Sequence, residues 1–333
     1  MKIFFNKKTK ALFVYKKKKK FNLCFKNLEI DYLEKNEVLI KLSFTSINYK
    51  DTLICNGNPG LVRKYPHVPG IDAAGTVHIS NSRKFKKGDK VFIVAQPFGI
   101  NTYGSFSKYL KADQKYVQKL PKNLTLKDTM IFGTAGFTAI YSILKILKQK
   151  IYKENKTALV SGATGGVGSI AIFFLSKLGF KISSITSKTK KTSYLKKIGV
   201  SKIIKSDSSK NLIKLPLLKK NYSLIVDSLG GEILPFGLRQ LYENGNFLLI
   251  GAIKNQYSNL GLMPFILRGV NLIGINAERS NKKERNIVWK KIALLSKNKK
   301  VKLIYKTVNF KNIINSLNNI KNNKSSGRIV VKF

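Results

Sequence analysis

Cysteine and histidine are scarce in this chain of 333 residues, which holds two of each: Cys24, Cys55, His67 and His78. So few cysteines imply no disulfide framework and indicate a reducing compartment. Four such side chains at these spacings cannot supply a four-cysteine structural zinc site together with a catalytic zinc triad. We therefore expect no metal in the protein.

Acidic residues are also few, because 16 Asp and Glu stand against 63 Lys and Arg, which gives a formal net charge of +47. A charge of this size raises the question of a nucleic-acid partner. Only seven of the basic residues are arginines, however, whereas proteins that read base edges favour the bidentate guanidinium. We favour solvated lysines spread by composition, with the densest run, 16–20, at a hairpin turn or strand edge.

Long apolar runs are missing from the first 20 residues, where lysines interrupt any stretch of the length that a signal peptide needs. The longest charge-free stretch, 157–176, reaches the length of a membrane span. It contains four glycines between Gly162 and Gly168, which favours a strand, a turn and a helix. We therefore expect a cytoplasmic protein with no membrane segment.

The pattern of short β-rich segments and turn signals changes near Pro121. Before it, the segments alternate with most of the chain's prolines, as in a compact all-β barrel, and we place the first domain at 1–121. After it, helical spacing over 126–147 is followed by short apolar strands separated by helices, which predicts a doubly wound parallel α/β domain at 122–262. The remainder, 263–333, holds a helix near 283–295 and a last strand that we expect to rejoin the first domain.

A glycine-rich motif, GxxGGxG over 162–168, directly follows a predicted strand and opens a predicted helix. Glycines are needed where the backbone turns sharply and where a pyrophosphate approaches bare N–H groups at the positive end of a helix. The place of the motif at the head of an alternating β/α region predicts a dinucleotide-binding site.

The cofactor is predicted from the end of the next strand, where an acid would bind the ribose 2′-hydroxyl of NAD. The sequence there is Thr186-Ser187-Lys188-Thr189-Lys190-Lys191, without a carboxylate. A hydroxyl and cations favour the 2′-phosphate of NADP, which a carboxylate would repel. We therefore predict NADPH as the cofactor.

Two further clusters are candidates for the substrate side. Polar residues gather at 46–51 and 66–77, where they are placed to bind a substrate or merely to cap turns. The segment 133–139, small and hydroxylated, fits close helix packing and room for a nicotinamide ring equally well.

Five segments carry a family resemblance: SINYKD at 46–51, PGIDAAGTV at 69–77, GTAGFTA at 133–139, GATGGVGS at 162–169 and MPFILRGVNLIG at 263–274. With them the chain resembles the zinc-free medium-chain dehydrogenase/reductases, and among these the acrylyl-CoA reductase branch of quinone-oxidoreductase-like proteins. The similarity extends from Lys2 to Phe333. Zinc-dependent relatives carry Gly-His-Glu where this chain has Gly70-Ile71-Asp72, and Asn48 stands in the place of their catalytic cysteine.

The resemblance implies a GroES-like catalytic domain, a Rossmann NADP-binding domain, and NADPH-dependent reduction of acrylyl-CoA to propionyl-CoA. It places Tyr49 against the nicotinamide as a donor of a hydrogen bond or proton, and Asn48 would orient either Tyr49 or the substrate carbonyl. The alternative is that Tyr49 only contacts the cofactor and solvent supplies the proton. It also implies a homodimer as the assembly. The cofactor-binding residues it implies are Tyr49, Thr134, Gly165, Gly166, Val167, Gly168, Ser187, Lys188, Tyr194, Ala252 and Asn323.

Other functions stay open. A quinone or enone reductase needs the same cofactor geometry, and a nucleic-acid-binding protein with a vestigial nucleotide fold would account for the charge. The sequence also departs from the branch at 274–279, with Asn276 and Ala277 in place of Asp and Ser, and at 103–106, which lacks a typical Gly-Gly pair. Both segments are expected near the substrate, so they bear on acyl specificity.

Overall fold

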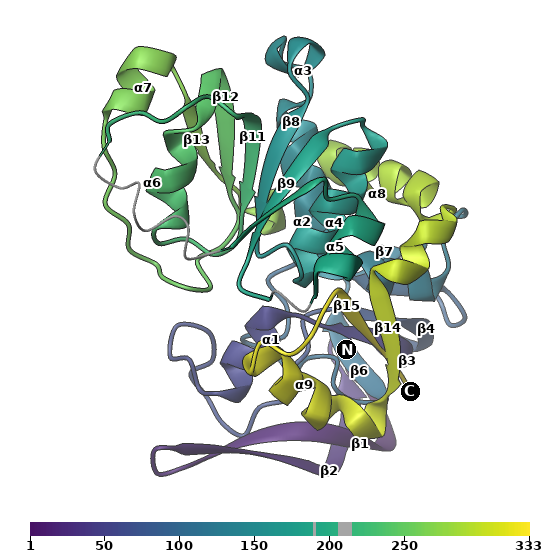
Figure 1. The fold of residues 1–333 in the computed structure, drawn as a ribbon. Coiled ribbons are helices and arrows are strands. Elements are labelled where there is room, and N and C mark those ends of the chain that lie inside the picture. Colours follow the sequence, from purple (N-terminus) through teal and green to yellow (C-terminus); the bar gives the residue numbers. More distant parts are fainter. Residues whose placement is uncertain (189–190, 206–214) are drawn as a thin grey trace. The chain divides into compact units, whose positions relative to one another are not determined.

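The computed structural model describes residues 1–188, 191–205 and 215–333, and the chain divides into two compact units. The first unit comprises Met1–Thr134 and Tyr305–Phe333, and the second comprises Ala135–Ile304 (Figure 1). The return to the first unit at Tyr305 differs from the expected position of 263, because the segment after 263 adds a strand to the sheet of the second unit.

The first unit is mainly β-structure, as the alternating segments before Pro121 predict. Its elements are β1 (Ile3–Lys17), β2 (Lys20–Leu33), β3 (Glu37–Ile47), α1 (Tyr49–Cys55), β4 (Ala73–Ser80), β5 (Lys90–Ile93), β6 (Tyr109–Asp113), β7 (Gln118–Lys119), β14 (Tyr305–Asn309), a 3₁₀ turn (Phe310–Asn312), α9 (Ile313–Lys321) and β15 (Arg328–Lys332). β1 and β2 form an antiparallel hairpin whose turn lies between Lys17 and Lys20, which confirms the hairpin interpretation of the lysine run.

Strand β3 organises the larger sheet of the first unit, whose order is β14-β15-β3-β4-β5-β7. One edge of β3 pairs with β4, and the other pairs with β6 at its beginning and with β15 at its end. The pairing with β15 is antiparallel and sets Ile329 opposite Ile47, so the start of β15 lies beside the end of β3. Apolar residues such as Val38, Ile40 and Val91 fill the core of this sheet.

The second unit is a doubly wound α/β domain, so the predicted fold class is confirmed. After α2 (Leu126–Ile146), which begins in the first unit, its elements are α3 (Ile151–Glu154), β8 (Thr157–Ser161), α4 (Gly166–Lys177), β9 (Lys181–Thr186), α5 (Thr192–Ile198), β10 (Lys202–Lys205), β11 (Tyr222–Asp227), α6 (Ile233–Leu238), β12 (Leu241–Leu249), α7 (Met263–Arg268), β13 (Asn271–Gly274), a 3₁₀ turn (Ala277–Arg279), α8 (Lys282–Ser296) and a second 3₁₀ turn (Lys299–Leu303).

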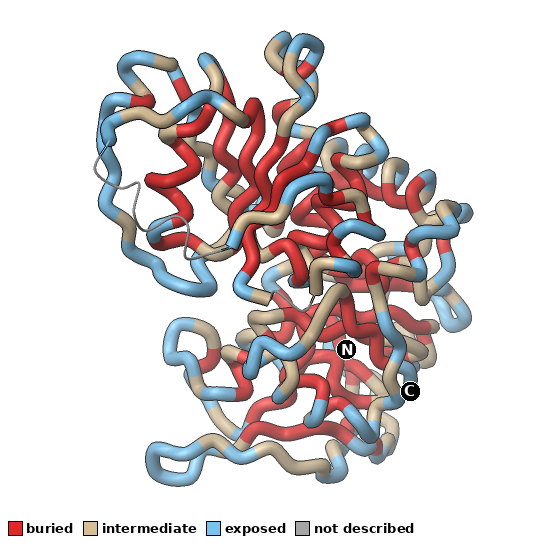
Figure 2. The backbone as a smooth tube through the Cα atoms, viewed as in Figure 1, coloured by how far each residue is buried: buried red, intermediate tan, exposed pale blue. Residues whose placement is uncertain are grey.

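All six strands of the second unit run parallel in the order β10-β9-β8-β11-β12-β13. The strand order reverses between β8 and β11, the position at which open α/β sheets bind ligands at their carboxyl edge. The central strands are buried on both faces, because helices cover the sheet (Figures 1 and 2). This explains why their sequences are continuous apolar runs without alternation.

Helix α2 is not the continuous helix that the spacing over 126–147 predicts, since Gly133 has φ 52° and ψ −162° and breaks it. In length and composition α2 would suffice to cross a membrane, but 78% of its most apolar window is buried inside the fold. Helix α2 is therefore a buried core helix with a break at Gly133.

Candidate functional site

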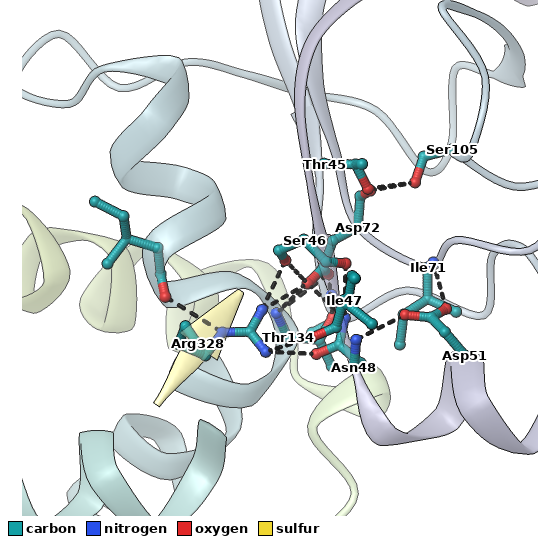
Figure 3. A network of polar contacts seen from close by, with 12 residues as sticks. Thr45, Ser46, Ile47, Asn48, Asp51, Ile71, Asp72, Ser105, Thr134 and Arg328 are labelled. Atoms are coloured by element: carbon teal, nitrogen blue, oxygen red, sulfur yellow. Dashed lines mark hydrogen bonds and ion pairs between the residues drawn. The ribbon is translucent and has the colours of Figure 1, made fainter. Parts of the chain in front are cut away.

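A buried carboxylate, Asp72, lies at the centre of a polar network in the first unit (Figure 3). Its Oδ2 accepts hydrogen bonds from Ser46 Oγ at 2.6 Å and from Asn48 Nδ2 at 2.8 Å. Its Oδ1 accepts from Thr134 Oγ1 at 2.6 Å, and the Thr134 N–H lies 3.0–3.1 Å from both oxygens. Arg328 Nη2 completes the set at 3.3 Å. We call Ser46, Asn48, Asp72, Thr134 and Arg328 the Asp72 network.

Arg328, the first residue of β15, supplies the compensating charge and is only 2% exposed. Besides Asp72, its guanidinium donates to Ser46 Oγ at 2.6 Å, Asn48 Oδ1 at 3.1 Å and the Ile47 carbonyl at 3.1 Å. Burial lowers the pKa of Arg328, and the negative charge of Asp72 opposes this shift. A buried ion is tolerated when its donors are satisfied in this way.

The break in α2 makes room for this guanidinium. A Cβ at Gly133 would meet Arg328 Nη2, Asp72 Oδ2 and Ser46 Oγ at contact distances that real Cβ atoms do not show. The positive φ of Gly133 also turns the next N–H, that of Thr134, toward Asp72. Glycine is therefore required on two grounds, and both concern the Asp72 network. That the 133–139 segment also leaves room for a nicotinamide ring stays a prediction.

Asn48 is held at the start of α1 from both sides. Its side chain bridges Asp72 and Arg328, and its backbone N–H donates to Asp51 Oδ2 at 2.7 Å. Asp51 also accepts from the Ile71 N–H at 3.2 Å and is fully buried. Burial raises the pKa of Asp51 to about 7, and the nearby Asp72 charge acts in the same direction. Tyr49 follows as the first residue of α1 and is half-buried.

Two hydroxyl groups hydrogen-bond the backbone carbonyl of Asp72. Thr45 Oγ1 donates to the Asp72 carbonyl at 2.6 Å, and Ser105 Oγ lies 2.5 Å from the same carbonyl and 2.7 Å from Thr45 Oγ1. Ser105 belongs to the 103–106 segment, whose sequence departs from the family pattern. The segment that departs from the family pattern therefore contacts the backbone of the central residue of the Asp72 network.

No three His, Cys, Asp or Glu side chains gather as metal ligands in residues 1–188, 191–205 and 215–333. At the place of the zinc-ligand motif, Asp72 binds Arg328 and Asn48, so its carboxylate is already occupied by hydrogen-bond donors. The residues present therefore suit a guanidinium rather than a zinc ion at this position.

In the second unit, the glycine-rich loop joins β8 to α4. Gly162 has φ +56°, and Gly165 is the N-cap of α4. A Cβ at Gly168 would collide with the Gly162 carbonyl, so the helix can approach the loop only because residue 168 has no side chain. No acidic residue lies in the first turn of α4. The Gly165 N–H donates to the Gly162 carbonyl at 2.8 Å, and the N-terminus of α4 that follows fits an anionic pyrophosphate.

The predicted 2′-phosphate residues lie at the end of the adjacent strand β9. Ser187 is exposed, and the Lys188 N–H donates to Thr186 Oγ1 at 3.0 Å. Burial lowers the pKa of Lys188, with a smaller contribution from Lys191. Thr189 and Lys190 lie outside the described residues. No described residue at this strand end is acidic, which fits a phosphate better than a free hydroxyl.

The remaining predicted residues are placed separately. Tyr194 lies on α5 with its hydroxyl buried, and burial raises its pKa to about 12. Ala252 is exposed on the loop after β12. Asn323 is exposed after α9 with φ 56°. The structure thus brings Asn48 and Thr134 together on one carboxylate and sets Gly165–Gly168 at the start of α4. The catalytic and cofactor-binding roles of all these residues stay predictions.

The sequence alone places Asp51 and Asp72 in the polar clusters at 46–51 and 66–77 without giving either carboxylate a role of its own, and it gives Arg328 none. Arg328 lies 256 residues from Asp72 in the chain. The signal that was available is compositional: arginine is rare here, and one of the seven sits at the start of the last apolar strand.

Comparison with known proteins agrees with this geometry. Residues 34–122 match the alcohol dehydrogenase GroES-like domain, and residues 166–293 match the zinc-binding dehydrogenase domain. The quinone oxidoreductase-like protein YhfP of Bacillus subtilis is 34% identical over 309 residues, which are 92% of this chain and 94% of YhfP. The chain belongs to the medium-chain dehydrogenase/reductase superfamily. Both domain matches confirm the predicted pair of folds.

Within this superfamily, the chain falls in the acrylyl-CoA reductase branch. Acrylyl-CoA reductase AcuI of Ruegeria pomeroyi is 34% identical over 82% of this chain and 83% of its own length. The crystal structure of Escherichia coli YhdH with bound NADPH has a TM-score of 0.91 at 28% identity and covers 97% of this chain and 99% of YhdH. That of B. subtilis YhfP with bound NAD has a TM-score of 0.91 at 33% identity, covering 98% and 100%. Both of these solved structures hold a nicotinamide dinucleotide.

Replacing Gly133 tests the space that the guanidinium needs. We expect Gly133→Ala to lower the free energy of unfolding by at least about 2 kcal/mol, because it adds backbone strain and a clash inside the Asp72 network. Gly88→Ala is the matched control, since Gly88 also has positive φ but a Cβ there meets nothing within 4 Å. Urea unfolding measures both; equal losses in the two variants would contradict the steric argument.

The buried Asp51 predicts a pH dependence of stability. Its carboxyl has a pKa of about 7 in the folded protein and about 3.8 when exposed, so the folded state binds the proton more tightly. The contribution of Asp51 to stability is therefore fully present below about pH 4 and is lost as the pH rises to about 7, by about 2 kcal/mol or more. The Asp51→Asn variant loses this slope, whereas Asp31→Asn, at an exposed position, keeps it. Parallel pH profiles for wild type and Asp51→Asn would refute the prediction.

Proposed function

We propose that this protein catalyses the NADPH-dependent reduction of the conjugated C=C bond of a short enoyl thioester in the cytoplasm, with acrylyl-CoA giving propionyl-CoA. The observation that carries the proposal is the 34% identity to acrylyl-CoA reductase over 83% of that enzyme. The Asp72 network supports it, because a guanidinium and amide occupy the place at which zinc-dependent relatives bind a metal.

The chemistry follows from the charge that develops in the substrate. When NADPH is bound, its nicotinamide supplies a hydride for the β-carbon. The thioester oxygen then gains enolate charge, and a proton must reach the α-carbon. The Asp72 network holds the Asn48 side chain in one orientation at the start of α1, next to Tyr49. We assign Tyr49 as the donor of the hydrogen bond or proton, with Asn48 as its positioning residue.

The cofactor preference is part of the proposal. Gly165, Gly166, Val167 and Gly168 would hold the pyrophosphate, and Ser187 with Lys188 would hold the 2′-phosphate. Thr134, Tyr194, Ala252 and Asn323 complete the proposed contacts. NADP and NADPH bound to the Salmonella enterica and E. coli YhdH proteins support this preference, and NAD bound to YhfP is the alternative.

Reduction of quinones or enones is the second candidate function. It is favoured by the 34% identity to YhfP, which is named as a quinone oxidoreductase. The same hydride delivery serves both classes of acceptor, so the substrate has to be decided by turnover.

Turnover of candidate substrates tests the reaction. We expect NADPH oxidation with acrylyl-CoA at a kcat/KM at least about tenfold above that with benzoquinone. Tyr49→Phe should lower kcat by about 10²-fold if the hydroxyl donates the proton. Tyr242→Phe, at another half-buried tyrosine, is the control and should leave kcat unchanged. Equal turnover of both substrates would favour the quinone reductase, and an unaffected Tyr49→Phe would assign the proton to solvent.

An acid placed at the end of β9 tests the cofactor preference. We expect Ser187→Asp to weaken NADPH binding by about tenfold or more and to leave NADH binding similar or tighter, because a carboxylate repels the 2′-phosphate and accepts from a 2′-hydroxyl. Asn123→Asp adds the same charge at an exposed position of the first unit and is the control. Titration calorimetry measures the affinity of the wild type and of both variants for each cofactor; wild-type protein that prefers NADH would contradict the assignment.

We also propose that the protein is a homodimer that pairs through the segment 255–276. This segment holds a single charged residue, Arg268, in a chain that is 24% charged. The Arg268 guanidinium is used internally, donating to the carbonyls of Leu218, Arg239 and Leu241 at 2.7–3.0 Å. Exposed apolar side chains lie along the segment: Tyr257, Leu260, Leu262, Met263, Ile266 and Leu267. Two chains of charge +47 repel, so a face without charge is where copies can meet.

Light scattering after gel filtration tests the dimer. We expect the wild type to elute as a dimer and Ile266→Glu with Leu267→Glu to be a folded monomer, because the charges would be buried without partners. Leu294→Glu changes an equally exposed leucine on α8 and should remain a dimer. A monomeric wild type at micromolar concentration would overturn the proposal.

A further inference from the structure

A second buried carboxylate, Asp227, lies at the carboxyl end of β11 in the second unit and has no place in the reaction described above. It is fully buried, and no ion pair among the described residues includes it. It accepts hydrogen bonds from Ser161 Oγ, from the Leu229 N–H at 3.0 Å and from the Gly230 N–H at 3.0 Å. A carboxylate suits this position because it only accepts, and donors converge on both of its oxygens.

The Ser161 hydroxyl connects two neighbouring strand ends. Ser161 is the last residue of β8 and directly precedes Gly162 of the glycine-rich loop. Its Oγ donates to Asp227 and accepts from the Ser228 N–H at 3.1 Å. A Cβ at Gly162 would collide with Ser228 Oγ, so the two loops touch directly. The connection lies where the strand order reverses, between β8 and β11.

The loop after β12 is attached to the same layer. The Ile250 N–H donates to the Asp227 carbonyl at 2.8 Å, and the Lys254 N–H donates to the Leu229 carbonyl at 2.9 Å. The Ile253 N–H donates to the Ser228 carbonyl at 3.2 Å. The segment 250–254, which includes Ala252, is therefore attached by backbone hydrogen bonds to the loop that follows β11.

We propose that Ser161 and Asp227 are positioning residues that hold three loops at the carboxyl edge of the sheet in their cofactor-binding arrangement. The loops are the glycine-rich loop, 228–231 and 250–254. The part of this inference that concerns NADPH rests on the proposed function; the ordering of the loops does not. Neither residue needs to touch the cofactor, because each acts through the backbone that it holds.

Truncation of the hydroxyl is the mildest test. We expect Ser161→Ala to weaken NADPH binding by about tenfold, because one hydrogen bond to a buried charge is lost and the loops spread over more conformations. Ser184→Ala is the matched control: Ser184 is a buried serine on β9 whose Oγ has no hydrogen-bond partner in the described part of the chain. It should bind NADPH like the wild type. Asp227→Asn should bind NADPH more weakly than Ser161→Ala does. The asparagine NH₂ group would face a backbone N–H donor, that of Leu229 or of Gly230, where the carboxylate has an acceptor oxygen.

Amide hydrogen exchange of the free protein gives a readout that does not depend on cofactor. We expect faster exchange at Leu229 and Gly230 in Ser161→Ala than in the wild type, and wild-type exchange there in Ser184→Ala. Unchanged exchange and affinity in Ser161→Ala would overturn the inference, as would equal losses in both serine variants. If the wild type binds no NADPH, the proposed function fails, whereas the exchange experiment still decides whether Ser161 and Asp227 order the loops.

Discussion

The buried ion pair between Asp72 and Arg328 is the interaction on which the arrangement of the first unit depends. Removing both charges from water is expensive, and the attraction between them offsets that cost only if the remaining donors and acceptors are satisfied. Here they are, by Ser46, Asn48 and Thr134 (Figure 3). Loss of one partner would leave a buried charge uncompensated, at a cost of about 3–5 kcal/mol.

This pair also determines which parts of the chain come together. Ser46 is near the end of β3, Asp72 precedes β4, Thr134 follows the break in α2, and Arg328 begins β15. Four segments that are distant in sequence therefore meet at one carboxylate. The contrast with the surface is large, since ion pairs such as Lys8 with Glu29 are exposed and contribute little. The excess of positive charge lies outside, while the charges of the buried network are balanced.

In the second unit, segments distant in sequence also meet at one place, but the topology of the sheet brings them together. In a parallel sheet all carboxyl ends meet at one edge, so the loops after β8, β9, β11 and β12 are neighbours by topology. Gly162 and Gly168 allow close contacts there that a side chain would block, and the Asp227 carboxylate accepts hydrogen bonds but has no counter-ion among the described residues. The fold supplies the place for a dinucleotide, and individual residues at the strand ends decide which one.

Periodicity and local motifs were sufficient to predict both domain folds, the glycine-rich loop and the lysine turn, because these follow from hydrophobic spacing and glycine geometry over a few residues. Asn48 and Thr134 were implied as site residues by the family resemblance, and their roles stay predictions; the carboxylate that joins them was not indicated. The return point at Tyr305 and the break at Gly133 were missed, since the first depends on β13 pairing with β12 and the second on the space that Arg328 requires.

What the sequence alone determined is thus the class of fold and the glycine-rich turn between β8 and α4, both of which are local in the chain. Only the tertiary structure decided that Asp72 and Arg328 form a pair, because their contact spans 256 residues and leaves no periodic signal. It also decided that Asp51 is buried, which changes the pKa of its carboxyl through desolvation. Burial and long-range pairing are properties of the folded chain, and no short segment contains them.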